Sequence, residues 1–275
     1  MMNHRIILKF GTDVLSRRAN GESSKKIDGG TIYKIAESVL NIKKQEGDEV
    51  VIITSGSALA GCYRNQQEFP RQEDFAREEN PRQAYADCLA ELAVAGTSTL
   101  SNLYERAFSN YGLNADYCLI TSADLRDDRE SPGIRRRINN MLKKGRVPVI
   151  NTNDFATIEE LLPKYGEYGF DDNDKLACLV AQFSSAQRLY FVTSHMLHNK
   201  DPILHSDAKE ITSYSVSSSP SIEWGDKSQH GRGGMKNKVE AACRTTRLGI
   251  KTYIITLDML PQIAGCQDLG TKFVE

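Results

Sequence analysis

Short apolar runs recur along the chain and alternate with longer segments whose apolar residues follow helical spacing. Six runs have the length and composition of buried β-strands, at residues 5–10, 49–54, 117–121, 147–151, 188–193 and 251–256. Helices are predicted at residues 31–45, 175–183 and 236–248. The alternation predicts an α/β fold, a three-layer sandwich in which helices cover both faces of a largely parallel central sheet.

Two polar segments interrupt this alternation. Residues 63–82 contain Pro70 and Pro81 and show no clean period, so we expect a loop or a lid there. Residues 213–221 are rich in Ser and are also expected to form a loop. A length of 275 residues permits one or two domains. Because the pattern shows neither a linker nor an internal repeat, we expect one continuous unit with two lobes.

The amino-acid composition argues against some classes of binding partner. Lys and Arg number 35 against 36 Asp and Glu, so no global field draws the chain to nucleic acid or to an anionic membrane. No run approaches about eighteen apolar residues, and the first residues lack a secretory signal, so a cytoplasmic location is expected. The cysteines lack the close pairs of a zinc site and are predicted to be reduced, mostly buried thiols; they are Cys62, Cys88, Cys118, Cys178, Cys243 and Cys266.

Small, polar or acidic residues follow nearly every predicted strand. In open α/β sheets the ligand lies outside the carboxyl ends of the strands, so these residues should gather around one pocket. They are Gly11, Thr12 and Asp13; Ser55, Gly56 and Ser57; Thr121 to Asp124; Asn151 to Asp154; Thr193 and Ser194; and, after a long excursion, Gly231 to Gly234. Each group alone is also typical of an ordinary turn, and only their convergence favours a binding site.

Three of these stretches can bind anions. In ILKFGTD, Lys9 closes a strand and Gly11 permits close approach of backbone N–H groups. In GRGGMKNK, glycines precede a helix that carries Lys238, and in VIITSGSALAG the Ser55 hydroxyl follows a strand. Each stretch also has a simpler interpretation. In the same order, these are a strand-end lysine that reaches water, a flexible connection before a helix, and a helix N-cap. No hydrolytic triad is recognisable, because none of the histidines is near these serine turns in the sequence.

An acidic cluster, DDND, precedes the apolar run at residues 175–183. Asp171, Asp172 and Asp174 would repel one another unless a cation or a hydrogen-bond donor lies nearby. One interpretation is a solvated turn that caps the following helix. The other is a site where carboxylates and the Asn173 amide meet a metal ion, a basic side chain or a substrate ammonium group.

Five motifs in this order resemble the amino acid kinase family and, within it, the glutamate 5-kinases. The motifs are LKFGT at 8–12, ITSGSALAG at 53–61, VPVINTND at 147–154, FDDNDKLACLVA at 170–181 and GRGGMKNKVEAA at 231–242. The resemblance covers nearly the whole chain. It implies a single domain over residues 1–275, with an acceptor-binding part at roughly 1–170, a nucleotide-binding part at roughly 171–275, and no C-terminal RNA-modification-like domain.

The resemblance also implies a reaction, the transfer of phosphate from ATP to the γ-carboxylate of L-glutamate, as in the first step toward proline. Lys9 and Lys238 would neutralise charge on the transferred phosphoryl group, and Asp174 would orient both lysines. Substrate-binding residues would be Ser55, Gly56, Asn151, Asp154, Asp172 and Asn173. Nucleotide-binding residues would be Lys9, Gly11, Thr12, Thr193, Ser194, Arg232, Gly233, Gly234, Met235 and Lys238. Mg²⁺ would accompany ATP without a protein metal site, and a homo-oligomer with feedback inhibition by proline is expected.

Several positions depart from the pattern of the family. Asp13 replaces the usual Ser or Thr, Asp171 replaces a glycine and Thr97 replaces a glutamine. Ser194 stands where the nucleotide loop usually has Asp, and the glycine of that loop is missing. Two alternatives therefore stay open: a relative acting on another small acidic acceptor, and a catalytically silent subunit that binds a nucleotide or an amino acid. Retention of both lysines and Asp174 argues against the silent subunit.

Overall fold

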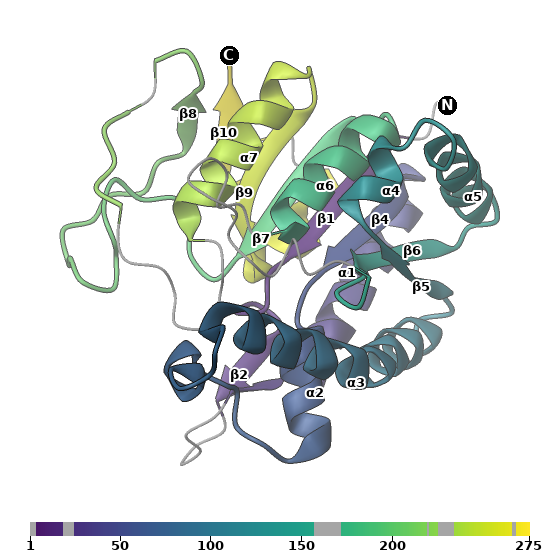
Figure 1. Ribbon diagram of the computed structural model, residues 1–275. Helices are drawn as coiled ribbons and strands as arrows, with labels where there is room; N and C mark the ends of the chain where they lie inside the picture. Colours follow the sequence, from purple (N-terminus) through teal and green to yellow (C-terminus); the bar gives the residue numbers. More distant parts are fainter. Residues whose placement is uncertain (1–3, 19–24, 157–171, 219, 225–233, 266–267) are drawn as a thin grey trace.

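The computed structural model describes residues 4–18, 25–156, 172–218, 220–224, 234–265 and 268–275. Within these residues eight strands form one sheet (Figure 1), in the spatial order β5 (Ala115–Ile120), β6 (Val147–Thr152), β4 (Glu49–Thr54), β1 (Arg5–Phe10), β7 (Arg188–Thr193), β9 (Lys251–Thr256), β10 (Thr271–Val274) and β8 (Ser213–Ser215). A separate antiparallel pair consists of β2 (Ser16–Arg18) and β3 (Lys25–Ile27).

The strands from β5 to β9 pair in parallel, and β10 then runs antiparallel to β9. The central strands are continuous apolar runs because helices cover both of their faces. All six predicted strands are confirmed, although β5 begins at Ala115 and ends at Ile120, one or two residues before the predicted bounds. Parallel pairing places the carboxyl ends of these strands at one edge of the sheet.

Helices lie on both faces of the sheet (Figure 1), with the bounds α1 (Gly29–Glu46), α2 (Ser57–Asn65), α3 (Pro81–Ser109), α4 (Ser122–Arg126), α5 (Ser131–Lys143), α6 (Asp172–Phe183) and α7 (Met235–Arg247), together with the 3₁₀ helices η1 (Gln72–Phe75) and η2 (Leu257–Gln262). Ile6 and Leu8 of β1 pack with α1 and α3, whereas Ile7 packs with α5, α6 and α7. The alternation of side chains along the strand thus gives two cores, and the three-layer prediction is confirmed. None of the described helices is long and apolar enough to cross a membrane.

The two polar segments are only partly loops. The segment 63–82 contains the end of α2, the short helix η1 and the first residues of α3. The prediction for residues 213–221 was wrong at its start, because Ser213–Ser215 forms β8 and pairs with β10 at the edge of the sheet. A strand of three residues with serines at both ends carries too little periodicity to be recognised. Helix α6 starts at Asp172, so Asp172, Asn173 and Asp174 of the acidic cluster lie in its first turn, whereas Asp171 lies outside the described residues.

Two glycines allow α2 and α3 to pack backbone against backbone. A Cβ atom added to Gly61 would lie 1.9 Å from the carbonyl oxygen of Leu92, and one added to Gly96 would lie 1.9 Å from the carbonyl oxygen of Ser57. No side chain fits at either position. The contact fixes the first residue of α2, and with it the turn that follows β4, against the long helix α3.

Candidate active site

Three charged side chains meet at the carboxyl edge of the sheet. Lys9 Nζ lies 2.5 Å from Asp174 Oδ1, in the first turn of α6. Lys238, in the first turn of α7, places its Nζ 3.3 Å from Asp174 Oδ2. The Lys9 and Asp174 side chains are fully buried, and the Lys238 side chain is 12% exposed. The three groups together carry a net positive charge, which suits them to an anionic ligand. The resemblance brought these three residues together, and the structure places them in contact.

Helices α6 and α7 are joined one turn below this cluster. Thr245 Oγ1 donates a hydrogen bond of 3.0 Å to Cys178 Sγ, and the thiol lies 3.4 Å from the carbonyl oxygen of Ala241. Burial raises the pKa of the Cys178 thiol to about 12, so the thiol is neutral at physiological pH. This contact fixes the helix that carries Lys238 against the helix that carries Asp174.

The side chain of Asn151 forms hydrogen bonds with other residues of the protein. Its Nδ2 donates to Ser57 Oγ at 2.7 Å and to the Tyr117 hydroxyl at 3.1 Å, and its Oδ1 accepts from the backbone N–H of Thr152 at 2.9 Å. Burial is the main reason that the pKa of Tyr117 rises to about 12, and the Asp154 carboxylate acts in the same direction. Asn151 therefore joins β6 to β5 and α2, which makes it a positioning residue; direct contact with a substrate stays a prediction.

A further hydrogen bond extends this network to the acidic cluster. Thr152 Oγ1 donates to Asn173 Oδ1 at 3.1 Å, and Asn173 precedes Asp174 in α6. Asp154 is half-buried two residues after Thr152 and acts electrostatically on Tyr117. Asp172 begins α6. The end of β6 and the start of α6 thus form one connected wall beside the charged cluster.

Ser55 does not cap the helix that follows it. The N-cap of α2 is Gly56, which has φ +99° and makes no side-chain cap. A Cβ atom on Gly56 would lie 3.0 Å from Ile27 Cδ1 of β3, so glycine is required for both space and backbone conformation. Among the described residues, the buried Ser55 Oγ has no hydrogen-bond partner. A buried hydroxyl of this kind is available to a ligand.

The predicted nucleotide residues lie at neighbouring strand ends. Gly11 directly follows β1, and a Cβ atom there would lie 3.9 Å from Lys9 Nζ, so the ammonium group lies close to this turn. Thr193 Oγ1 contacts the carbonyl oxygens of His195 and Ile255, at 2.5 and 3.2 Å, and Ser194 is exposed. Thr12 lies in the turn after Gly11, and Gly234 and Met235 begin α7. The predicted contacts at Arg232 and Gly233 lie outside the described residues.

Thr121 and Asp124, which the sequence predicts beside the pocket, form a local helix cap. Thr121 Oγ1 accepts a hydrogen bond of 3.0 Å from the backbone N–H of Asp124, and Asp124 Oδ2 accepts one of 2.7 Å from the backbone N–H of Thr121. This capping box starts the short helix α4. Both side chains are therefore used by the helix, and that they also line the pocket stays a prediction.

Sequence reasoning placed Ser57 and Thr152 among the residues that follow strands but gave them no supporting role, and it overlooked Tyr117. Ser57 and Thr152 directly follow predicted site residues, and each was part of a quoted motif. Their polar side chains directly beside apolar strand residues and predicted site residues were the available signal. Tyr117 gave a weaker one, because a tyrosine in a strand is normally interpreted as an apolar residue. Its hydroxyl contacts Ser57 at 3.3 Å, across sixty residues of sequence.

The sequence matches a known family and several of its members. The model of the amino acid kinase family matches residues 4–256. Glutamate 5-kinase of Caldanaerobacter subterraneus subsp. tengcongensis is 33% identical over 277 residues, which cover 98% of this chain and 68% of that protein. Glutamate 5-kinase of Acaryochloris marina is 30% identical over 281 residues, covering 99% of this chain and 69% of that protein.

Solved structures of other kinases share the fold. Isopentenyl phosphate kinase of T. acidophilum superposes with a TM-score of 0.64 at 15% identity, over 98% of this chain and all of that chain. UMP kinase from Bacillus anthracis gives a TM-score of 0.62 at 14% identity, over 98% of this chain and 95% of that chain. At such identities the likeness shows the fold alone.

Proposed function

The chain belongs to the amino acid kinase family, and from that premise we propose that it transfers the γ-phosphoryl group of ATP to the side-chain carboxylate of L-glutamate. The product would be glutamyl 5-phosphate, as in the first step of proline biosynthesis. Relatives at 30–33% identity carry the name glutamate 5-kinase. The structural observation that carries the proposal is the Asp174 carboxylate, held between the ammonium groups of Lys9 and Lys238.

The chemistry requires alignment and charge neutralisation more than proton transfer. A carboxylate oxygen of glutamate attacks the γ-phosphorus, a new P–O bond forms, and the bond to the β-phosphate oxygen breaks to release ADP. The nucleophile is already ionised at neutral pH, so no general base is needed. In this proposal Lys9 and Lys238 neutralise negative charge on the transferred group and on the leaving phosphate, and Asp174 fixes where both ammonium groups lie.

The acceptor is proposed to lie between the turn after β4 and the start of α6. Ser55 Oγ supports this placement, because it is buried and has no partner among the described residues. Asn173 and Asp154 would face the ammonium and carboxylate groups of glutamate. The wall that carries Asn173 would be held in position by Asn151, Thr152 and Tyr117, which would thus act indirectly.

Magnesium is proposed to enter as part of the substrate, bound to the phosphates of ATP. Among the described residues, no three His, Cys, Asp or Glu side chains converge as ligands. The phosphate oxygens would therefore hold the ion, which would spread the charge that the two lysines also neutralise. Nucleotide phosphates are expected near Gly11 and the start of α7, where Lys9 and Lys238 meet.

Hydroxylamine trapping tests the reaction directly, because an acyl phosphate is converted to a stable hydroxamate. Protein, ATP, Mg²⁺ and glutamate together should give glutamyl hydroxamate, whereas omission of glutamate or of Mg²⁺ should give none. Aspartate and N-acetylglutamate are assayed in parallel. Trapped product from another acceptor but not from glutamate would assign the enzyme to a different substrate, and no ATP turnover with any acceptor would favour the silent subunit.

A matched pair of variants ties that activity to the described site. Lys238→Ala removes one of the two ammonium groups at Asp174, whereas Lys236→Ala removes an exposed lysine from the same turn of α7. Hydroxamate formation should fall in the first variant and persist in the second. Equal activity of the two proteins would remove Lys238 from the mechanism.

A further inference from the structure

A second polar pocket lies at the opposite edge of the sheet from Asp174. It has a volume of about 330 Å³ and opens at the amino ends of β1 and β4, where Arg5 and Glu49 begin their strands. The remaining lining residues come from α5 and from the turn after α6: Arg135, Asn139, Lys143, Ser184, Ser185 and Gln187. None of them belongs to the proposed kinase site.

Helix α5 contributes one continuous stripe to this pocket. Arg135, Asn139 and Lys143 are spaced four residues apart, so they lie above one another on one face of the helix. Arg135 Nη2 donates to Ser185 Oγ at 3.0 Å, and its guanidinium carbon lies 5.9 Å from the centroid of the Phe183 ring. The stripe therefore faces the end of α6, with Arg135 held in place by two contacts.

The turn after α6 is rigid. Ser185 has φ +56°, its backbone N–H donates to Gln182 O, and the N–H of Ala186 donates to Ala181 O. These two bonds form a Schellman motif, which fixes the direction of the chain at Ser184. Arg5 Nη1 also donates to the carbonyl oxygen of Ser184 at 2.5 Å. Ser184 thus has a defined position although its side chain has no role in the turn.

Two polar groups in this pocket have no partner among the described residues. Ser184 is 3% exposed, and its Oγ accepts and donates no hydrogen bond. Asn139 Oδ1 is equally inaccessible and equally unpaired. A buried unpaired polar group costs about 1–3 kcal/mol, so two in one pocket indicate a missing partner. An Asn amide can turn by half a rotation, and its Nδ2 donors then take the place of Oδ1.

The charge of the lining residues identifies the kind of partner. Glu49 already pairs with Arg5, through Nε at 3.0 Å and Nη2 at 2.5 Å. Arg135 and Lys143 remain as excess positive charge, and both are exposed enough to move toward a ligand. Cations near helix carboxyl ends also complement the helix dipole, but that explanation leaves Ser184 and Asn139 unpaired.

We propose that this pocket binds a small oxyanion, a phosphate or a carboxylate group, between Ser184, Asn139, Arg135 and Lys143. The Ser184 hydroxyl and the turned Asn139 amide donate to it, and the two cations neutralise its charge. The site lies on elements that also form the proposed kinase site: β1 runs from Arg5 to Lys9, and α6 runs from Asp174 toward Ser184. The proposal concerns binding, and it does not depend on the proposed reaction.

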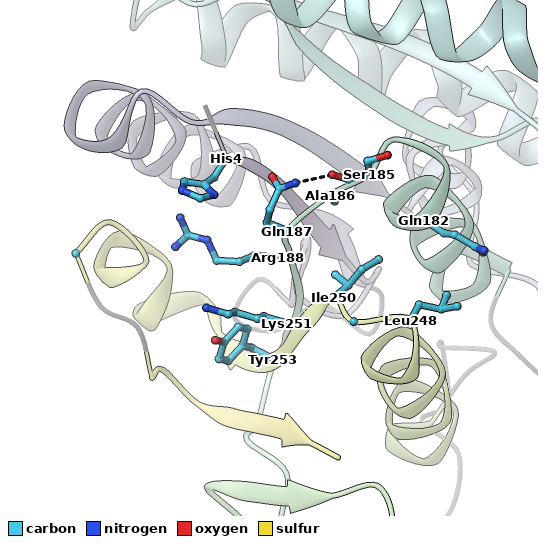
Figure 2. A pocket seen from close by; sticks show the side chains of 12 residues that line it. His4, Gln182, Ser185, Ala186, Gln187, Arg188, Leu248, Ile250, Lys251 and Tyr253 are labelled. Atoms are coloured by element: carbon cyan, nitrogen blue, oxygen red, sulfur yellow. Dashed lines mark hydrogen bonds between the residues drawn. The ribbon is translucent and has the colours of Figure 1, made fainter. Parts of the chain in front are cut away.

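A larger hollow of about 840 Å³ lies beside this pocket and shares Ser185 and Gln187 with it (Figure 2). Figure 2 shows the Gln187 amide directed at Ser185, where its Nε2 donates to the carbonyl oxygen at 2.7 Å. Arg188, which lines the larger hollow, pairs with Asp48 at 2.8 Å. Among the described residues that line it, the hollow has no counterpart to the unpaired Ser184 and Asn139, so the smaller pocket is the assigned site.

Isothermal titration with orthophosphate, and separately with succinate, tests the proposal in the absence of ATP and glutamate. Ser184→Ala and Asn139→Leu remove the unpaired groups while keeping their volumes nearly unchanged. Arg136→Ala is the matched control, because it removes an exposed cation of α5 that does not line the pocket. Thermal unfolding of each variant confirms that it is folded.

Wild-type protein should bind at least one probe saturably, and each pocket variant should weaken that binding about tenfold, the loss of one charge-assisted hydrogen bond. Arg136→Ala should bind within about twofold of wild type. The probe that binds more tightly distinguishes phosphate from carboxylate as the natural group. Binding that persists in both pocket variants but is lost in Lys238→Ala would place the anion at the catalytic edge and overturn the proposal, as would no saturable binding of either probe below roughly 50 mM.

Discussion

Lys9 Nζ lies 2.5 Å from Asp174 Oδ1, and neither side chain is exposed. A buried pair of this kind has two effects that mutation experiments easily confuse. It fixes a charge where a ligand can use it, and it removes two ions from water at a cost that their mutual contact helps to offset. Because the pair is fully buried, single substitutions at this site should change stability as well as activity.

Breaking the pair should cost much more stability than removing it whole. Asp174→Ala removes the carboxylate that the buried Lys9 ammonium contacts, which costs about 3–5 kcal/mol of unfolding free energy. Lys9→Ala leaves Asp174 with its longer contact to Lys238, at 3.3 Å, and should cost less. The double variant Lys9→Met with Asp174→Leu replaces both ions by apolar groups and should regain most of that loss. Urea unfolding measures the stability, and turnover should remain about 10²-fold or more below wild type in all three. A double variant as unstable as the singles would contradict this interpretation.

Lys238 should behave differently from Lys9, because its side chain is 12% exposed and its contact with Asp174 is longer, at 3.3 Å. Lys238→Ala should lower turnover about 10²-fold while the unfolding free energy changes by about 1 kcal/mol or less. Steady-state kinetics and urea unfolding on the same preparation test this. A large loss of stability with normal turnover of the folded fraction would make Lys238 a structural residue.

Gly96 should tolerate no side chain, because its added Cβ would lie 1.9 Å from the Ser57 carbonyl oxygen and 2.3 Å from the Gly61 nitrogen. Gly96→Ala should cost more than about 3 kcal/mol or prevent folding, since backbone cannot move aside. Gly133→Ala in α5 is the matched control, because its added Cβ meets only the flexible end of Arg137, at 3.3 Å. That control should raise helix stability by roughly 0.5–1 kcal/mol.

Because Tyr117 is buried, the free energy of unfolding should depend on pH under alkaline conditions. Burial raises its pKa from 10 to about 12, so the folded protein holds the phenolic proton more tightly than the unfolded chain does. The resulting stabilisation is complete below the unfolded pKa and is lost as the pH rises from 10 toward 12. Tyr117→Phe should be less stable than wild type at neutral pH and should lose less stability across that range. Parallel slopes of unfolding free energy against pH would exclude Tyr117 as the cause.

The fold was largely predictable because its signals are local. Six strands are continuous apolar runs that periodicity identifies, and parallel pairing then requires their carboxyl ends to share an edge. The site was predictable only in outline. Lys9, Asp174 and Lys238 come from motifs more than sixty residues apart, and no spacing rule indicates that one carboxylate contacts both lysines.

The supporting side chains were harder to predict, because their roles depend on packing. Tyr117 and Ser57 contact each other only after β5 and α2 have been placed against β6. Thr121 and Asp124 illustrate a different difficulty, since a polar pair after a strand can form a local capping box as well as line a pocket. Burial together with hydrogen bonding separates the two cases, and neither is visible in a single sequence.

The wall formed by Asn173 and Asp154 should determine affinity for the acceptor rather than for the nucleotide. Asn173 Oδ1 accepts from Thr152 Oγ1 at 3.1 Å, so its amide is held against the end of β6, which is followed by Asp154. Asn173→Ala and Asp154→Asn should each raise the KM for glutamate about tenfold, the value of one hydrogen bond to a charged group, with the KM for ATP within about twofold of wild type.

Ser194→Asp provides the complementary control, because Ser194 is exposed at the end of β7 on the proposed nucleotide side. This variant should change the Kd of a non-hydrolysable ATP analogue, measured by calorimetry with Mg²⁺, more than it changes the KM for glutamate. The two sets of variants therefore make opposite predictions for the two ligands. Equal losses for both ligands in either set would mean that the pocket is not divided in this way, because a merely loosened fold weakens both sides together.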